Sequence, residues 1–254
     1  MKGIGKALFT TFLSGVGLLV YMYTLAHRNR LMKHTLTVKE DASKQLSIFF
    51  ISDIHRRRIP MRLIQKLQVS GVDAVIAGGD VAEKGVPLKR VKHNMRQLSS
   101  IGPLYYIFGN NDQEIGTEQL LQIIREVQGV TLVDSSARIP GHSSWGICGM
   151  EDPSNGTVDA EKAIESAVGY EHLILAVHNP SLFRKVEDRL KPDLMLAGHT
   201  HGGQIRLGKW GLQDLGRYEK TAKGAKLISN GFGTTMVPLR FGAKPECHLV
   251  KIHY

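Results

Sequence analysis

The chain has 254 residues and a formal charge of +10, from 33 Lys and Arg against 23 Asp and Glu. Hydrophobic residues make up 42% of it and charged residues 22%, which is typical of a folded protein and excludes a disordered, collagen-like or low-complexity chain. The two cysteines, Cys148 and Cys247, are too few for a disulfide scaffold and form no CxxC pair. We therefore interpret both as buried thiols.

The positive charge is concentrated at the N-terminus. Residues 1–33 contain five Lys and Arg and no acid, so the other 221 residues carry only +5. A protein that binds duplex nucleic acid usually has a dense basic face. We therefore expect no duplex nucleic acid among the partners of this chain.

An uncharged run of twenty residues, ALFTTFLSGVGLLVYMYTLA, lies between Lys6 and His27. As a helix it would span about 30 Å, the thickness of a bilayer core, and it is longer than the ~7–15 apolar residues of a signal peptide. We predict an uncleaved, single-pass anchor over residues 1–30 in the cell membrane. A cleaved signal or a buried core helix are the alternatives. More Lys and Arg follow the run than precede it, which favours a cytoplasmic main domain.

Residues 31–44 are predicted to be a polar linker, and residues 45–254 a single domain. In that domain apolar runs predict strands, and amphipathic stretches predict helices. The expected strands are 46–52, 73–79, 104–110, 130–133, 145–149, 172–177, 193–197, 226–229 and 247–252. The expected helices are 60–70, opened by Pro60, 88–98, 117–128, capped by Thr117, 158–168 and 182–189. Three successive strand–helix units indicate an α/β fold with a parallel or mixed sheet.

Polar residues follow five of these strands. In α/β sheets, the loops at the carboxyl ends of the strands share one rim. The sequences there are DIH, GGD, GNND, HNP and GHTHGG, in chain order. They supply seven candidate metal ligands: Asp53, His55, Asp80, Asn110, His178, His199 and His201.

The chemistry of this set indicates two metal ions. Carboxylate and amide oxygens with imidazole nitrogens suit Mn, Fe or Zn, whereas the absence of thiolates argues against a structural zinc site. Seven ligands are too many for one ion, but they fit two divalent ions about 3.5–4 Å apart that share a carboxylate. Each short motif alone is common in proteins without metals, so the prediction depends on all five occurring together.

The motifs DIH, GGD, GNND, HNP and GHTHGGQI, in this order, resemble those of the calcineurin-like metallophosphoesterase superfamily from about residue 46 to the C-terminus. The resemblance implies a four-layer α/β/β/α sandwich of two mixed sheets covered by helices. The segment 229–252 and the apolar N-terminal run resemble a narrower branch, the membrane-anchored bacterial phosphoesterases related to UDP-2,3-diacylglucosamine pyrophosphohydrolases.

The same resemblance implies a role for each ligand. Asp53, His55, Asp80 and His201 would hold one ion, and Asp80, Asn110, His178 and His199 the second, so that Asp80 bridges the two. In such a centre the ions orient a phosphate and lower the pKa of a water that attacks phosphorus in line. The implied function is hydrolysis of a phosphodiester or pyrophosphate bond in a phosphorylated small molecule or lipid, such as a cell-envelope intermediate.

One position departs from the family pattern. The family's G-N-H-[DE] histidine is Asn111 here, and an amide donates a hydrogen bond but cannot transfer a proton. We therefore expect substrates with poor leaving groups to react slowly. Asp112 is expected to orient this loop, or else only to cap a turn. At least one of Arg56, Arg57 and Arg58 is expected to clamp a phosphate, unless they form a solvated loop.

Two other functions stay open at this point. The first is a non-catalytic metal-binding scaffold, in which Asn111 marks lost activity. The second is a phosphodiesterase acting on nucleotides. The complete set of seven ligands disfavours the scaffold, because a scaffold has no physical reason to keep a costly cluster of charges.

Overall fold

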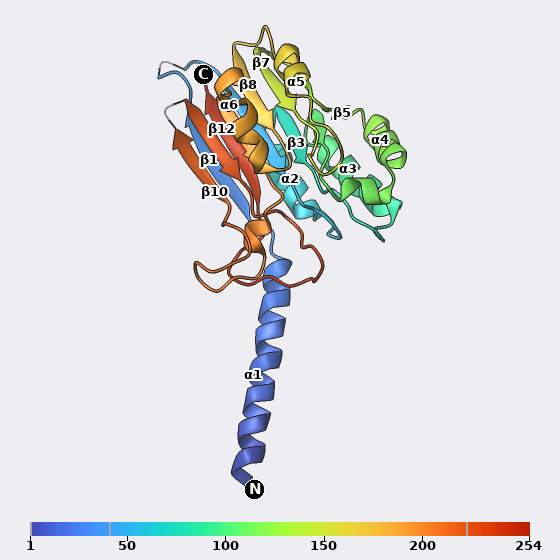
Figure 1. The fold of residues 1–254 in the computed structure, drawn as a ribbon, viewed down its shortest axis with the longest axis vertical. Coiled ribbons are helices and arrows are strands. Elements are labelled where there is room, and N and C mark those ends of the chain that lie inside the picture. Colours follow the sequence, from blue (N-terminus) through green and yellow to red (C-terminus); the bar gives the residue numbers. More distant parts are fainter. Residues whose placement is uncertain (1, 41, 222) are drawn as a thin grey trace.

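The computed structural model describes residues 2–40, 42–221 and 223–254, as one long helix that leads into two packed β-sheets (Figure 1). The long helix, α1, covers Lys2–Ala26. The first sheet has the strand order β1-β12-β2-β3-β4-β5. Its bounds in that order are Leu31–Thr37, Cys247–His253, Gln45–Ile51, Ala74–Gly78, Leu104–Ile107 and Val130–Thr131.

The second sheet has the strand order β10-β11-β9-β8-β7-β6. Its bounds in that order are Arg217–Thr221, Gly224–Ile228, Leu194–Ala197, His172–Ala176, His142–Gly149 and Ser135–Ile139. The strands β2 to β5 are parallel to one another, and so are β7, β8, β9 and β11. The antiparallel pairs are β12 with β2, β10 with β11 and β6 with β7, so both sheets are mixed.

Helices cover the outer face of each sheet. The helices α2, α3 and α4, at Met61–Val69, Leu88–Ser99 and Thr117–Glu126, pack on the first sheet, and α5 and α6, at Ala160–Ser166 and Phe183–Leu190, pack on the second. Alternation along β2 shows why the layers form: Phe49 faces the helices, whereas Ile48 and Phe50 face the second sheet. The result is the expected four-layer α/β/β/α sandwich.

Three strands went unrecognised in the sequence. The expected linker 31–44 contains β1, which pairs in parallel with β12, and β6 and β10 are edge strands of the second sheet. An edge strand needs few apolar residues: Leu36 is the one buried side chain of β1. The rest of the expected linker includes residue 41, which lies outside the described residues.

Thr117 is also not a cap. Helix α4 begins at Thr117 itself, and its N-cap is Gly116, whose φ of 94° suits glycine.

Helix α1 stands largely free of the domain. Its stretch Phe9–Ala26 has a mean hydropathy of 1.5 and is only 17% buried, so this helix is long and apolar enough to cross a membrane. Among the side chains of α1 that the structure describes, the buried ones lie in its last turn and a half: Met22, Leu25 and Ala26.

Candidate metal centre

The carboxyl ends of β2, β3, β4, β8 and β9 meet at one edge of the sandwich, and all seven predicted ligands lie there. Backbone hydrogen bonds join the loops across this edge. The N–H of Asp53 donates to the carbonyl of Gly79 at 2.9 Å, and the N–H of His199 donates to the carboxylate of Asp53 at 3.1 Å. The two sheets therefore contribute to a single site.

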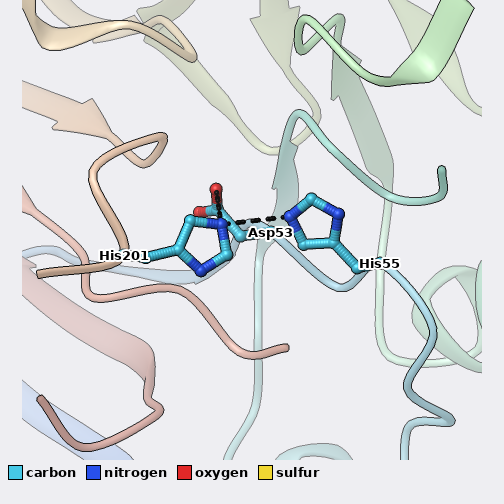
Figure 2. Close-up of side chains that lie close together, drawn as sticks. All are labelled: Asp53, His55 and His201. Atoms are coloured by element: carbon cyan, nitrogen blue, oxygen red, sulfur yellow. Dashed lines mark hydrogen bonds and ion pairs between the residues drawn. The ribbon is translucent and has the colours of Figure 1, made fainter. Parts of the chain in front are cut away.

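One group of ligands consists of Asp53, His55 and His201 (Figure 2). The Nε2 atoms of His55 and His201 lie 3.0 Å apart, and Nε2 of His201 lies 3.2 Å from Oδ1 of Asp53. Oδ2 of Asp80 lies 3.7 Å from Nε2 of His55. These are the four residues that the family resemblance assigned to the first ion.

The second group lies on the other side of Asp80. Nε2 of His178 is 3.4 Å from Oδ2 of Asp80 and 3.2 Å from Oδ1 of Asn110. The same Asn110 oxygen lies 2.9 Å from Nδ1 of His199. Asp80 is thus within reach of both groups, which is the position expected of a bridging carboxylate.

The distances test whether these residues fit metal ions. Ligand atoms about 2.1 Å from one tetrahedral ion lie about 3.4 Å from one another. The distances above scatter around that value, and the ring nitrogens of His55 and His201 face each other inside the protein. Three ligands are fully buried, and Asp80 and His201 nearly so. The donor set, its spacing and its burial therefore fit divalent ions.

The backbone at the site is in an uncommon conformation. Asp53, His55, Asp80, His199 and His201 all have positive φ, between 49° and 70°. Non-glycine residues with positive φ are rare and cluster at functional sites, because the strain must be offset by the surrounding structure. Close packing accompanies the strain: a Cβ on Gly79 would lie 2.5 Å from Nδ1 of His178.

Neighbouring groups fix which ring nitrogen faces the centre. Nδ1 of His55 lies 2.9 Å from Oε2 of Glu83, and Nδ1 of His178 lies 2.9 Å from the carbonyl oxygen of Gly78. A proton on each Nδ1 leaves Nε2 unprotonated, with the free electron pair that binds a metal ion. Glu83 was not predicted from the sequence, because a single Glu in a loop carries no signal.

The charges of the cluster compensate one another. Burial alone would raise the pKa of Asp53, but the imidazoles of His201, His178 and His55 lower it overall. Burial likewise lowers the pKa of His178, yet the carboxylates of Asp80 and Asp53 raise it to about 10. The carboxylates of the cluster therefore stay ionised although they are buried, and they attract positive charge, which protonated imidazoles or divalent ions can supply.

Asn111 and Asp112 both act on Asp80. The backbone N–H of Asn111 donates to Oδ1 of Asp80 at 2.8 Å, and its Nδ2 donates to Oδ2 at 2.7 Å. Oδ2 of Asp112 accepts from the N–H groups of Asp80 and Gly109 and from the hydroxyl of Tyr106, each at 2.8 Å. Asp112 therefore ties together the loops after β3 and β4, as expected of an orienting residue.

The three arginines have different surroundings. Arg56 pairs with Glu83. Arg57 donates to the carbonyls of His27, Arg28 and Phe232, so its guanidinium faces the protein and the end of α1. Arg58 is exposed and makes no hydrogen bond or ion pair with any residue that the structure describes. All three arginines line one cavity, and most donors of Arg57 are used by backbone carbonyls of the protein.

Asp152 is a ligand candidate that the sequence analysis missed. It is fully buried, its Oδ2 has no hydrogen-bond partner among the described residues, and it groups with His178 and His199. A signal was present, because Met150, Glu151 and Asp152 directly follow the strand expected at 145–149 and so belong to the same rim.

Comparison with known proteins agrees with this geometry. A family model described as the calcineurin-like phosphoesterase superfamily domain matches residues 46–209. An uncharacterised protein of Bacillus subtilis (strain 168), YpbG, is 40% identical over 235 residues, covering 91% of this chain and 90% of the relative. The chain belongs to the calcineurin-like phosphoesterase superfamily, whose members use divalent metals.

Two further similarities are more distant. Phosphodiesterase YaeI of Escherichia coli (strain K12) is 29% identical over 189 residues, covering 70% of this chain and 68% of the relative. The crystal structure of a 5'-nucleotidase precursor from Thermus thermophilus has a TM-score of 0.54 at 13% identity, covering 82% of this chain and 55% of that one. The second similarity concerns the fold alone.

Proposed function

We propose that this chain is a membrane-anchored phosphoesterase that uses two divalent ions to hydrolyse a phosphodiester or pyrophosphate bond. The observation that carries the proposal is the convergence of seven ligands from five loops into two groups that share Asp80. Two ions held there would orient the phosphate and activate a water for attack on phosphorus.

The residues around the ions suggest the type of bond. Asn111 stands where the family has a histidine, and its backbone N–H and its side-chain Nδ2 each donate a hydrogen bond to Asp80. No imidazole at this position protonates the departing oxygen, so the leaving group must be stable as an anion. Phosphodiesters of acidic alcohols and pyrophosphates meet this condition, whereas alkyl monoesters do not. The similarity to YaeI, which is named a phosphodiesterase, is in line with this choice.

The anchor is the second part of the proposal. The apolar, exposed surface of α1 supports a single membrane span, and Arg28, Arg30 and Lys33 beyond it favour a domain on the cytoplasmic face. A substrate in the plane of the membrane, such as a lipid or cell-envelope intermediate, would be accessible to such an enzyme.

A substrate panel tests the reaction. The full chain, purified in detergent and loaded with Mn²⁺, should hydrolyse bis(p-nitrophenyl) phosphate faster than p-nitrophenyl phosphate, and glycerol phosphate slowest. The chelated protein should be inactive and regain its rate when Mn²⁺ is added. A metal-loaded, folded protein that hydrolyses none of them would instead support the scaffold alternative.

A further inference from the structure

Two loops of the second half of the chain, residues 205–215 and 234–241, lie around the end of α1 that enters the domain (Figure 1). We call them the collar. The N–H of Arg206 donates to the carbonyl of Phe241 at 2.8 Å, which joins one loop to the other. The two loops therefore form one surface.

The collar contacts α1 about one turn before the helix ends at Ala26. The N–H of Arg240 donates to the carbonyl of Met22 at 3.1 Å, and the rings of Tyr21 and Phe241 pack edge to face with centroids 6.2 Å apart. Tyr21 precedes Ala26, the last helical residue, by five positions, or about 7.5 Å along the axis. The collar thus overlaps the last part of the apolar span.

If α1 spans a bilayer, this overlap sets how deeply the domain sits in the membrane interface. The uncharged run of α1 has twenty residues, just enough to cross about 30 Å of hydrocarbon if it is used to its end. The collar occupies the level of its last turn and a half. Surfaces that lie in the membrane interface penetrate about 5–10 Å, which is the same depth.

The side chains of the collar suit that depth. Four large apolar side chains are at least three-quarters exposed: Leu207, Trp210, Leu212 and Met236. The loop that carries three of them is held rigid from inside, because the buried guanidinium of Arg206 donates to the carbonyls of Gly202, Lys209 and Gln213. Large apolar side chains exposed on an ordered loop mark a binding face, and tryptophan is typical of the bilayer interface.

A basic cavity opens beside the collar. It has a volume of about 500 Å³ and reaches from His27, just beyond α1, to Glu83, which contacts the metal ligand His55. Four arginines line it, Arg56, Arg57, Arg58 and Arg90, together with Met236 of the collar. With one acid among these arginines, the cavity favours an anionic group.

We propose that the collar lies in the interfacial layer of the bilayer, so that the arginine cavity receives the anionic headgroup of a membrane lipid. This inference rests on the proposed membrane span and phosphoesterase site, and it assigns the substrate of that site to the lipid phase. The continuity of the collar with the apolar surface of α1 identifies the occupant as the bilayer.

The chain contains a built-in reporter for this contact. It has two tryptophans, Trp210 in the collar and the fully buried Trp145. The full chain is placed in nanodiscs of phosphatidylcholine that is brominated either near the headgroup end or near the methyl end of its acyl chains. The difference in fluorescence between the wild-type protein and Trp210→Phe isolates Trp210 without disturbing the core.

The proposal predicts that Trp210 is quenched by the shallow bromines, less by the deep ones and hardly by acrylamide. A matched control introduces Val168→Trp into the Trp210→Phe protein. Val168 is 79% exposed and precedes β8, at the opposite edge of the sheet from the metal centre. This reporter should respond to acrylamide and not to brominated lipid. Strong acrylamide quenching of Trp210 overturns the proposal, and so does shielding from both quenchers, which would mean that a second copy covers the collar.

A comparison of hydrolysis rates on a soluble and a membrane-embedded diester tests whether the collar helps to supply a lipid substrate. The double variant Trp210→Ala with Leu212→Ala should hydrolyse bis(p-nitrophenyl) phosphate at the wild-type rate. Its rate on a phosphatidyl p-nitrophenyl diester in nanodiscs should fall at least several-fold. Equal rates of variant and wild type on the lipid contradict the inference. If the wild type hydrolyses neither compound, the proposed reaction is contradicted. The fluorescence quenching experiment then tests separately whether the collar contacts the membrane.

Discussion

Asn111 donates two hydrogen bonds to Asp80, at 2.8 and 2.7 Å, and this explains how an asparagine is accommodated where the family has a histidine. The amide holds the bridging carboxylate in one orientation. What it cannot supply is a proton for the leaving oxygen. At the scale of single residues, we therefore infer a site that binds metals and has no general acid at position 111.

We expect the rate of this enzyme to depend steeply on the pKa of the leaving group. Aryl diesters should react well and alkyl esters poorly, and Asn111→His should accelerate the poorest substrates by up to ~10²-fold if the ring reaches the departing oxygen. The measurement is the wild-type rate over a graded series of phosphodiesters under conditions where chemistry limits the rate. A flat series would mean that another group acts as the acid.

Asp152 provides a second test at this scale. If its unpartnered Oδ2 helps to hold the second ion with His178 and His199, Asp152→Asn should weaken the binding of about one of two ions by ~10-fold or more. The matched control is Asp159→Asn, because Asp159 only caps α5 through the N–H of Lys162 and asparagine caps equally well. The measurement is a titration of both variants with Mn²⁺. If Asp152→Asn binds both ions as tightly as the control Asp159→Asn, Asp152 is not a ligand.

At the scale of elements, β1, β12 and β2 form a section of the first sheet with an unusual buried group. His248 of β12 is almost fully buried, and burial, His34 on β1 and Arg30 lower its pKa to about 3. Its Nε2 lies 2.9 Å from the hydroxyl of Ser229 and 3.8 Å from Glu246. His248 is therefore neutral in the folded protein over the whole physiological range.

This burial makes stability depend on pH. Below the ordinary histidine pKa of about 6.5, the unfolded chain binds a proton that the folded chain does not, so the free energy of unfolding falls as the pH falls toward 3. The contribution of one proton is about 1.4 kcal/mol per pH unit. Between pH 7 and pH 5, the melting temperature of the full chain should fall less for His248→Gln than for the wild type. His253→Gln, on the same strand, is the control. Parallel curves for His248→Gln and the wild type would contradict this assignment.

The central strands of the fold follow from sequence, whereas three of the four edge strands of the two described sheets do not. All nine expected strands occur, including the edge strand β5, and central runs such as LSIFFIS are easily recognised because they are buried. The strands β1, β6 and β10 escaped prediction since a strand at or near an edge exposes polar side chains and resembles a loop. Strand β1 also explains why the expected boundary between linker and domain falls inside a sheet.

The site was predictable for a related reason. Its ligands follow buried strands, and the carboxyl ends of parallel strands must share one edge. Residues that act through others, such as Glu83 behind His55, gave no signal because their partners are distant in sequence. The sequence also could not distinguish Arg57 from Arg56 and Arg58, because the carbonyls at the end of α1 that accept from Arg57 are distant in sequence.

At the scale of the whole molecule, two sheets meet at an edge that carries the seven candidate ligands, and helix α1 enters beside it (Figure 1). Apolar clusters fill the space between the sheets and between each sheet and its helices, and the charged cluster lies at the rim. Its buried carboxylates attract cations. The two-ion centre is thus the central claim on which catalysis and substrate both depend.

The most direct test is the metal content of the purified full chain, measured by mass spectrometry after loading with Mn²⁺ and removal of free metal. We predict about two ions per chain for the wild type and for Asp188→Asn, an exposed acid on α6. Asp80→Asn should retain far less than one ion and lose nearly all hydrolysis of bis(p-nitrophenyl) phosphate, because the shared charge is removed from both positions. A folded wild-type protein that binds no ion, or an Asp80→Asn variant that keeps two ions and full activity, would contradict the account.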